Sequence, residues 1–397
     1  MYSIFFLAVT VICVDFDIST PLPRQDTAFY QIKSRINKKY NAKYDYAAHA
    51  LAGINQLQKW YDFEDGLWDK AWWPSANIVT MIAGLQEYFP YHIRSLTDFI
   101  FPNTLEKTTK RFPDFINEFY DDELWWALAW IKVYDITQNE TYLNTAADIF
   151  EDSKSVWGQT PCGGLWWDKN HTEVGAVVNE LYLTTAAKLA NRLPESPHPG
   201  YYMDEAMKAH NWFQESGLIN GDNLINNALN LQTCKNDGNF VFTYNQGILL
   251  SGLAELTYGT KDQKYVNLAN TIAVAAINAM IGSDGILREP CEPDACNGDQ
   301  EQFKGIFSRN IQFLYKNNPN ISAETATLFK NFLLKNAESI WAKDNVNNQM
   351  GLVWSGPKGK VSVQTQSSAL DAIVGAAAMS LFVGVFIIPA LPGVHIT

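Results

Sequence analysis

The chain has 397 residues, which allows one large domain or two ordinary ones and is ample for a sizeable core. Aromatic residues make up 13% of it, with 13 tryptophans, which is a high share for a globular protein that is 47% apolar. The net charge of −12 argues against a protein that tracks a nucleic-acid backbone, because that function needs clustered lysine and arginine. A neutral or basic partner fits better.

The chain begins with an apolar run, MYSIFFLAVTVICV, followed by the polar stretch DFDISTPLPRQDT. The run is too short for a membrane span and suits the apolar region of a secretory signal, although no basic residue precedes it. We therefore expect residues 1–20 to be a signal peptide and residues 21–378 to form one domain of a secreted protein. Three N-x-S/T sequons, at Asn139, Asn170 and Asn320, agree with secretion and predict glycosylation.

Short Gly-Leu or Gly-Ile turns recur along the chain, as GLWD at 66, GLWW at 164, GLIN at 217, GILR at 285 and GLVW at 351. The last four lie 53, 68 and 66 residues apart, which is the length of a two-helix repeat. Between the turns, apolar residues fall at helical spacing, as in ELWWALAWIKVY and EVGAVVNELYLTTAAKLA. Few stretches alternate as strands do, so the sequence predicts an almost entirely helical protein.

The first helix of each pair is predicted to begin near residues 74, 120, 174, 244, 300 and 364. The second helices are predicted near 141, 200, 262 and 322, with 45–60 and 91–108 completing the set. Six such hairpins can bury their apolar faces on one another by closing into a toroid, which removes the exposed ends of an open solenoid. The predicted fold class is therefore all-α, an (α/α)6 barrel. Polar and aromatic residues begin each first helix, so we expect a ligand-binding cleft at that end of the ring.

The helix predicted from residue 120 begins YDDELWW, with Asp121 and Asp122 adjacent. Aspartate favours helix N-termini because it accepts bonds from free backbone N–H groups, so capping is the alternative role for this pair. Neighbouring side chains at a helix start diverge by about 100°, and two carboxyl groups can then reach the separation of about 5 to 5.5 Å found in retaining glycosidases. Their repulsion raises one pKa while the helix N-terminus stabilises the other charge, as an acid and a nucleophile require.

Four cysteines remain once Cys13, inside the predicted signal, is set aside. Because their number is even and the compartment oxidising, we expect Cys291 to pair with Cys296 across the turn-like EPDA, and Cys162 with Cys234. Zinc is the competing interpretation, but the spacing lacks paired C-x-x-C units and only 6 histidines occur. We therefore expect no metal.

The segment AIVGAAAMSLFVGVFIIP at residues 372–389 is apolar enough for a membrane or lipid-anchor signal, yet no polar spacer precedes it. A buried last helix that runs into an apolar tail over residues 379–397 is the alternative. Membrane association is expected only through that tail, and the protein is expected to be a monomer.

Several blocks of the sequence resemble glycoside hydrolase family 76, the endo-α-1,6-mannanases, in its secreted fungal branch. The signature-like block is YDDELWWALAWIKVYDITQNETYLNTAADIF. Further blocks follow in the family's order: CGGLWWD at 162–168, TYNQGILLSGLAELT at 243–257, LREPCEPDAC and DQEQFKGIFSRN within 287–310, and TQSSALDAIV at 365–374. The similarity extends from about residue 44 to residue 375.

The resemblance implies an (α/α)6 barrel, a retaining mechanism and cleavage inside the α-1,6-linked mannose backbone of cell-wall mannan, without a cofactor. It also implies that Asp121 is the nucleophile and Asp122 the general acid/base. Family members related to yeast wall-assembly proteins are thought to be transglycosylases on the mannose core of lipid-anchor glycans, and the same two aspartates serve either outcome. A non-catalytic mannan-binding protein on the same toroid is the further alternative.

From the starts of the inner helices we also expect substrate contacts, at Asn77, Trp126, Trp167, Asn179, Tyr244, Asn245, Gln246 and Lys304. Capping is the alternative for Asn77 and Asn245, and an ion pair is the alternative for Lys304. Since Trp125 and Trp126 are consecutive on one helix, at least one of them is expected in the core.

Overall fold

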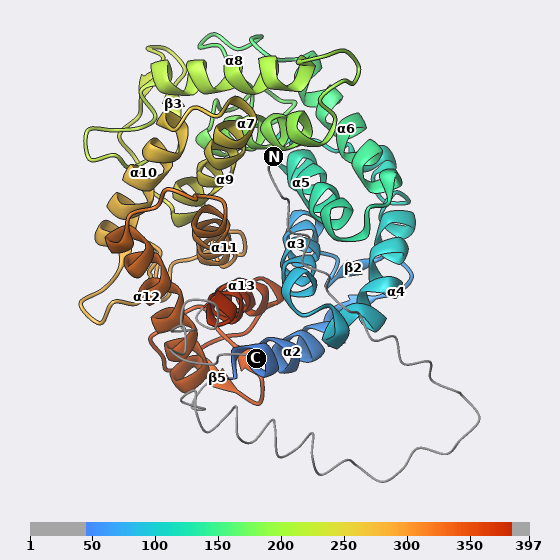
Figure 1. Cartoon of the computed structure of the whole chain (residues 1–397), viewed down its shortest axis with the longest axis vertical. Coiled ribbons are helices and arrows are strands. Elements are labelled where there is room, and N and C mark those ends of the chain that lie inside the picture. Colours follow the sequence, from blue (N-terminus) through green and yellow to red (C-terminus); the bar gives the residue numbers. More distant parts are fainter. Residues whose placement is uncertain (1–44, 383–397) are drawn as a thin grey trace, which may run out of the picture. The chain divides into compact units, whose positions relative to one another are not determined.

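The computed structural model describes residues 45–382, so the predicted signal peptide and most of the predicted tail lie outside the described residues. Within this range six helices form an inner ring: α3 (Trp72–Tyr88), α5 (Tyr120–Thr137), α7 (Ala176–Arg192), α9 (Thr243–Thr260), α11 (Phe303–Lys316) and α13 (Val363–Phe382). Each packs on the next, and α13 packs on α3, so the ring is closed (Figure 1). The predicted (α/α)6 barrel is confirmed.

A second layer of six helices packs around the ring: α2 (Tyr46–Leu57), α4 (Pro90–Thr108), α6 (Glu140–Ser155), α8 (Tyr201–Ser216), α10 (Lys264–Met280) and α12 (Ala323–Ser339). The outer helices bury one face, as in α6, where Tyr142, Ala146 and Ile149 recur at helical spacing. Inner helices are buried on nearly all sides, and every residue of α9 from 243 to 257 is buried. The inner helices are more buried because they are surrounded by other helices, whereas each outer helix has one face in contact with solvent.

The two ends of the ring differ in their connections. Loops that lead into inner helices are long, covering residues 58–71, 109–119, 156–175, 217–242, 281–302 and 340–362, whereas the longest turn at the opposite end covers 193–200. We call these the loop end and the turn end. The loops contain short helices at Gln58–Trp60, Pro113–Phe115 and Ile340–Asp344. They also contain three antiparallel hairpins: β1 (Tyr61–Asp62) with β2 (Leu67–Trp68), β3 (Leu229–Asn230) with β4 (Lys235–Asn236), and β5 (Asn345–Val346) with β6 (Gln349–Met350).

A polar side chain three residues after the start of five inner helices anchors the incoming loop. Each accepts a hydrogen bond of 2.8 to 3.1 Å from a loop backbone N–H group. These loop anchors are Ser75, Glu123, Asn179, Gln246 and Gln366. Because a buried backbone N–H group without a partner is costly, the anchors fix the long loops onto the ring.

Glycine allows the inner helices to approach closely. A Cβ atom on Gly247 of α9 would lie 2.7 Å from Cα of Phe307 on α11. A Cβ on Gly305 of α11 would lie 2.6 Å from Cα of Ser368 on α13. Both positions therefore require glycine for the helices to pack at this distance.

Partly buried ion pairs join neighbouring inner helices at the turn end. Arg192 of α7 pairs with Asp135 of α5 at 2.6 Å and with Glu255 of α9 at 3.3 Å. Lys132 of α5 pairs with Glu87 of α3 at 2.6 Å. Partial burial shields these pairs from solvent, and together they link α3, α5, α7 and α9.

Helix α13 covers part of the segment that the sequence marks as a membrane or anchor signal. Residues 365–379 are all buried within the ring, and the helix continues to Phe382, past the predicted domain boundary at 378. Across residues 45–382, no helix combines the length and the apolar character that a membrane span needs. The expectation of a buried last helix is confirmed for this part of the segment.

Candidate active site

Asp121 and Asp122 lie in the first turn of α5 at the loop end, and both side chains are half-buried. The N-cap residue, Phe119, has no side chain that can accept from the first-turn N–H groups. The start of the helix is held by the loop before α7, because Tyr120 N donates to the Trp167 carbonyl over 3.0 Å. The aspartates thus lie beside the first backbone N–H groups of the helix, and these donors oppose the rise that burial causes in the pKa of Asp121.

The two carboxyl groups have unequal surroundings. Burial raises the pKa of Asp121 to about 7, while the Trp167 side chain and the backbone N–H groups oppose the rise. Burial also raises the pKa of Asp122 well above its ordinary value, and the negative charge of Asp121 adds to this shift. Two close carboxyl groups resist ionising together, so the pair retains one proton. Because the donors around Asp121 favour its ionised form, that proton resides on Asp122.

Residues of the loop before α5 hold the Asp122 side chain through a series of contacts. The amide of Asn117 donates to Oδ2 of Asp122 over 2.7 Å, and the backbone N–H of Asn117 donates to Glu123 over 3.0 Å. Glu123 is fully buried and pairs with Lys169 at 2.9 Å, and Lys169 also reaches Asp152 at 3.2 Å. Asn117 is therefore fixed at both its side chain and its backbone, which fixes the Asp122 carboxyl group.

Aromatic rings lie close to the aspartates. Trp167 packs on Phe119 with ring centroids 4.9 Å apart, and both side chains are partly exposed. Trp73 of α3 is partly exposed too, lies 5.9 Å from Trp125, and donates from its indole to Asp299 over 2.8 Å. The charge of Asp299 raises the pKa of both aspartates, so Trp73 and Asp299 belong to the same site. Faces of this kind suit the apolar C–H surfaces of sugars.

The start of α9 brings Tyr244 and Asn245 to the same end of the ring. The Tyr244 ring stacks on Phe303 at 3.7 Å, and its hydroxyl donates to Asn227 Oδ1 over 3.4 Å. Burial raises the pKa of Tyr244, and the Asp121 charge adds to the shift, which places Tyr244 near the catalytic candidates. Asn245 is fully buried, donates to the same Asn227 oxygen over 3.3 Å and has an Oδ1 without a protein partner.

The expectation that Trp126 contacts substrate is wrong. Its side chain is fully buried, with ring centroids 5.1 Å from Trp72, 5.2 Å from Phe115 and 5.5 Å from Trp130. Trp125 is only 3% exposed as well. Both tryptophans of YDDELWW are therefore core residues, and the partly exposed rings beside the aspartates come from other elements.

Three predicted contact residues have structural partners instead. Asn179 and Gln246 are fully buried loop anchors, and their amides donate to the carbonyls of Gly175 and Phe242, four residues earlier. Asn77 donates to the Trp73 carbonyl over 3.2 Å and accepts from Arg309. Hydrogen bonds within the protein thus describe Asn77, Asn179 and Gln246 better than substrate contact, because their polar atoms are already paired. The capping alternative for Asn77 and Asn245 is wrong, since α3 and α9 have no side-chain hydrogen bond at their N-caps.

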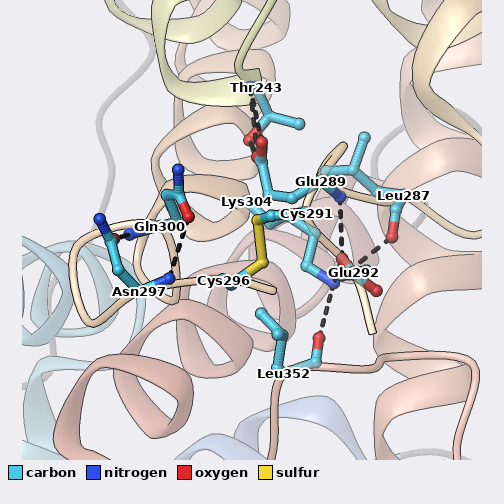
Figure 2. The surroundings of a disulfide bond; sticks show 10 residues. All are labelled: Thr243, Leu287, Glu289, Cys291, Glu292, Cys296, Asn297, Gln300, Lys304 and Leu352. Atoms are coloured by element: carbon cyan, nitrogen blue, oxygen red, sulfur yellow. Dashed lines mark hydrogen bonds and ion pairs between the residues drawn. A yellow bond between two sulfur atoms is a disulfide. The ribbon is translucent and has the colours of Figure 1, made fainter. Parts of the chain in front are cut away.

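Lys304 also has a structural partner, as Figure 2 shows. Its ammonium group is 1% exposed, pairs with Glu292 at 2.6 Å and donates to the Leu352 carbonyl over 2.7 Å. Nearby, the fully buried Glu289 accepts from Thr243. The ion-pair alternative for Lys304 is therefore correct, and the pair holds the loop at 281–302 against the ring.

Both expected disulfides are present. Cys291–Cys296 closes a small turn in the loop that carries Asp299 (Figure 2). Cys162–Cys234 joins the loop of Trp167 to the turn between β3 and β4, in the loop at 217–242. Two long loops at the loop end are therefore covalently linked. Among residues 45–382, no three His, Cys, Asp or Glu side chains are grouped as a metal site requires.

A cavity of about 90 Å³ lies within the ring, with Trp125 and residues of all six inner helices in its lining. Neither aspartate lines it. Its charged side chains already have partners, since Arg309 pairs with Asp371 at 3.1 Å. We therefore regard this cavity as part of the ring's packing and place the candidate site around Asp121 and Asp122.

The sequence analysis did not single out Asn117, and it placed Trp73 and Asp299 at the predicted starts of inner helices without assigning them a substrate contact. The residues WWP at 72–74 mark a helix start with an aromatic residue, which is a usable signal for Trp73. Asn117 lies five residues before Asp122, but an asparagine before a helix is an ordinary turn residue. Asp299 stands at the predicted helix start near residue 300, but its proximity to the aspartates depends on the closing of the ring.

Curated proteins of similar sequence are mannan-acting fungal proteins by name. The chain is 24% identical over 205 residues to the mannan endo-1,6-alpha-mannosidase DFG5 of Candida albicans, covering 48% of this chain and 45% of that protein. It is 28% identical over 208 residues to the mannan endo-1,6-alpha-mannosidase DCW1 of Saccharomyces cerevisiae, covering 48% of this chain and 44% of that protein. The matched part spans less than half the length of these two relatives.

A solved structure shares the fold. It is an inactive variant of the alpha-1,6-mannanase GH76A of Salegentibacter sp. HEL1_6, with two consecutive aspartates replaced by alanine, in complex with alpha-1,6-mannotetrose. The TM-score is 0.71 at 21% identity, and the alignment covers 85% of this chain and 100% of that one. The model of glycosyl hydrolase family 76 matches residues 36–382. The chain described here is therefore a member of glycosyl hydrolase family 76.

Proposed function

We propose that this protein is a retaining glycosidase that cleaves α-1,6-mannosidic linkages inside mannan. One observation carries the proposal: the sequence contains a single pair of consecutive aspartates, and the fold places it at the loop end with unequal surroundings. The names of the relatives supply the substrate class, and the solved neighbour was inactivated at two consecutive aspartates.

The proposed reaction uses the two carboxyl groups in turn. Ionised Asp121 attacks C1 of the mannose unit while Asp122 gives its proton to the glycosidic oxygen, so the C1–O bond breaks and a mannosyl-aspartate forms. Asp122, now ionised, takes a proton from a water molecule whose oxygen attacks C1. The bond to Asp121 then breaks, which releases the sugar with its original anomeric configuration and restores both carboxyl groups.

The remaining residues hold and tune this pair. Asn117 orients Asp122, while the backbone N–H groups and Trp167 favour the ionised form of Asp121. Trp73 and Trp167 offer partly exposed rings to the sugar, and Asp299 presents an exposed carboxylate to its hydroxyl groups.

The test replaces Asp121 and Asp122 separately with asparagine and assays linear α-1,6-mannan. We expect loss of at least about a hundredfold in kcat/KM for each, as removal of a positioned proton donor or nucleophile requires. Asp98→Asn on the outer helix α4 is the matched control, because its carboxylate is exposed and pairs with the exposed Arg94 of the same helix. Full activity in either site variant would refute the assignment, and an inverted product at the first turnover would refute retention.

The same intermediate can transfer mannose to a sugar hydroxyl instead of water, which is the transglycosylase alternative. Adding an α-1,6-mannobiose acceptor to the assay separates the outcomes, because a transglycosylase lengthens the acceptor while a hydrolase only shortens the mannan. Binding without any product would identify a non-catalytic mannan-binding protein.

We also propose that the protein is secreted, to the extracellular space or the cell wall, and carries N-linked glycans. The sequon residues Asn139, Asn170 and Asn320 are all exposed, and two disulfides are typical of an oxidising compartment. Treatment of the natively expressed protein with an N-glycosidase should increase its electrophoretic mobility. An unchanged mobility would refute glycosylation.

A further inference from the structure

A continuous series of aromatic rings leads outward from the site. Tyr244 of α9 stacks on Phe303 of α11 at 3.7 Å, and Phe303 lies 6.5 Å from Trp73, which bonds to Asp299. In the other direction Phe303 lies 5.4 Å from Phe242, and Phe242 lies 5.2 Å from Phe240. The series therefore runs from the surroundings of the aspartates to the loop that precedes α9.

Only the outer end of this branch is open to solvent. Phe303, Tyr244 and Phe242 are each exposed by less than a tenth, whereas Phe240 is 63% exposed. Phe240 lies nearly parallel to Phe242, with an interplanar angle of 13°, so one of its faces is covered and the opposite face is open. Leaving such a ring in water forgoes about 1.5–3 kcal/mol of burial.

The backbone around Phe240 is held in place by asparagine residues. Asn227 donates from its backbone N–H to the Phe240 carbonyl over 2.9 Å, and Asn226 donates from its side chain to the Asn239 carbonyl over 2.6 Å. Cys234, earlier in the same loop, is bonded to Cys162 of the loop that carries Trp167. The exposed ring is thus preorganised, which lowers the entropic cost of binding a ligand to it.

Polar groups border the ring. Asp237 accepts from the backbone and the side chain of Asn239 at 2.9 and 3.0 Å, and both residues are at least partly exposed. An apolar face rimmed by polar groups is typical of a ligand-binding groove. A neutral pyranose has the matching chemistry, with an apolar C–H face and a rim of hydroxyl groups.

We propose that the open face of Phe240 is a distal sugar-binding platform, on which one pyranose unit of an extended α-1,6-linked mannose chain stacks while another unit occupies the aspartate site. This inference rests on the proposed function and deepens it, because the platform makes the enzyme prefer long chains. Short oligosaccharides that fill only the aspartate site do not reach Phe240.

The test compares α-1,6-mannotriose with α-1,6-mannohexaose for the wild type, Phe240→Ala and Phe240→Trp. We expect Phe240→Ala to lower kcat/KM for the hexaose by about tenfold, or about 1.4 kcal/mol, with no change for the triose. Phe240→Trp should preserve the preference for the hexaose. Tyr91→Ala is the matched control, because Tyr91 is 98% exposed and lies on α4 at the turn end.

Equal losses for both sugars, or no loss for either, would overturn the platform. To separate this inference from the proposed reaction, binding of both sugars is also measured by calorimetry in the Asp121→Asn background. Weaker hexaose binding on adding Phe240→Ala would support the platform even where the wild type yields no product. Unchanged hexaose binding would overturn it even where the wild type cleaves mannan.

Discussion

The side-chain amide of Asn117 donates a 2.7 Å hydrogen bond to Oδ2 of Asp122, and Asn117 is itself fixed by its backbone N–H bond to Glu123. A donor favours the ionised form of a carboxyl group, so this bond lowers the pKa of Asp122 against the effect of burial. Asn117 thereby makes Asp122 able both to give and to take a proton during one turnover.

Replacing Asn117 with alanine should move the alkaline limb of the pH–activity profile upward. The acid must be protonated for bond cleavage, and loss of the donor raises the pKa of Asp122, so protonation persists to higher pH. We also expect kcat to fall by about tenfold or more, because proton transfer depends on position. Asn317→Ala, at the turn end, is the matched control, since that side chain bonds only to the Phe313 carbonyl. An alkaline limb that stays in place would contradict this role.

Glu180→Gln should stabilise the protein at alkaline pH. Glu180 is fully buried in α7, both its oxygens lack a hydrogen-bond partner among residues 45–382, and burial raises its pKa well above the ordinary value. A raised folded-state pKa gives stability at low pH that is lost as pH rises from about 4.3, by up to about 1.4 kcal/mol per pH unit. Denaturant unfolding between pH 4 and pH 8 should therefore show a growing advantage of the variant. Parallel curves would contradict an ionisation cost at Glu180.

Glu87→Gln is a control in which the pH dependence of stability should have the opposite sign. Burial acts to raise the pKa of Glu87, but Lys132 and Lys316 outweigh it and lower that pKa to about 2. A lowered folded-state pKa gives stability that is present above the unfolded-state value and is lost as pH falls toward 2. This variant should therefore be less stable than the wild type at pH 7, and the difference should shrink at acid pH.

Arg192→Ala should destabilise the fold by about 1.5–3 kcal/mol, because it removes charged hydrogen bonds to the half-buried Asp135 and to Glu255, which keeps Lys188 as a partner. Arg288→Ala is the comparison, since its pair with Asp284 is exposed and worth about 0–1 kcal/mol. Urea unfolding measures both. The kcat/KM of Arg192→Ala at a temperature where it is folded should match the wild type, because Arg192 lies at the turn end.

The two disulfides should differ in their effect on stability. The pair Cys162–Cys234 spans 72 residues and Cys291–Cys296 spans 5. Loop-closure entropy then predicts losses of about 4 and about 2 kcal/mol when each pair is replaced by serine. Thermal and denaturant unfolding of the two double variants would test this order, and an equal or reversed order would contradict the entropic account.

The ring and its helix starts could be predicted from the sequence, because five of the six inner helices follow a glycine turn and because polar or aromatic residues stand at the helix starts. The structure begins α5 at Tyr120, α9 at Thr243 and α13 at Val363, each within one residue of the prediction. The candidate catalytic pair could be predicted as well, since Asp121 and Asp122 are consecutive and their separation depends on the local chain alone.

Contacts between segments far apart in the chain could not be predicted from the sequence. Asn179 and Gln246 were assigned to substrate because a polar side chain at a helix start indicates either a ligand or a cap. Their true partners are the N–H groups of Leu165 and Ile225, which lie 14 and 21 residues earlier. The burial of Trp126 depends on α3 and the loop at 109–119, which no helical periodicity in α5 reveals.

The closure of the ring by α13 has a consequence for synthesis on the ribosome. Gln366 of α13 donates to the Gly53 carbonyl of α2, across 313 residues of sequence. Until residues 363–382 have left the exit tunnel, the flanks of α3 and α11 that α13 covers have no partner, and a chain in this state exposes apolar surface. The nascent protein therefore completes its barrel only after translation of the last inner helix, and it needs protection from aggregation until then.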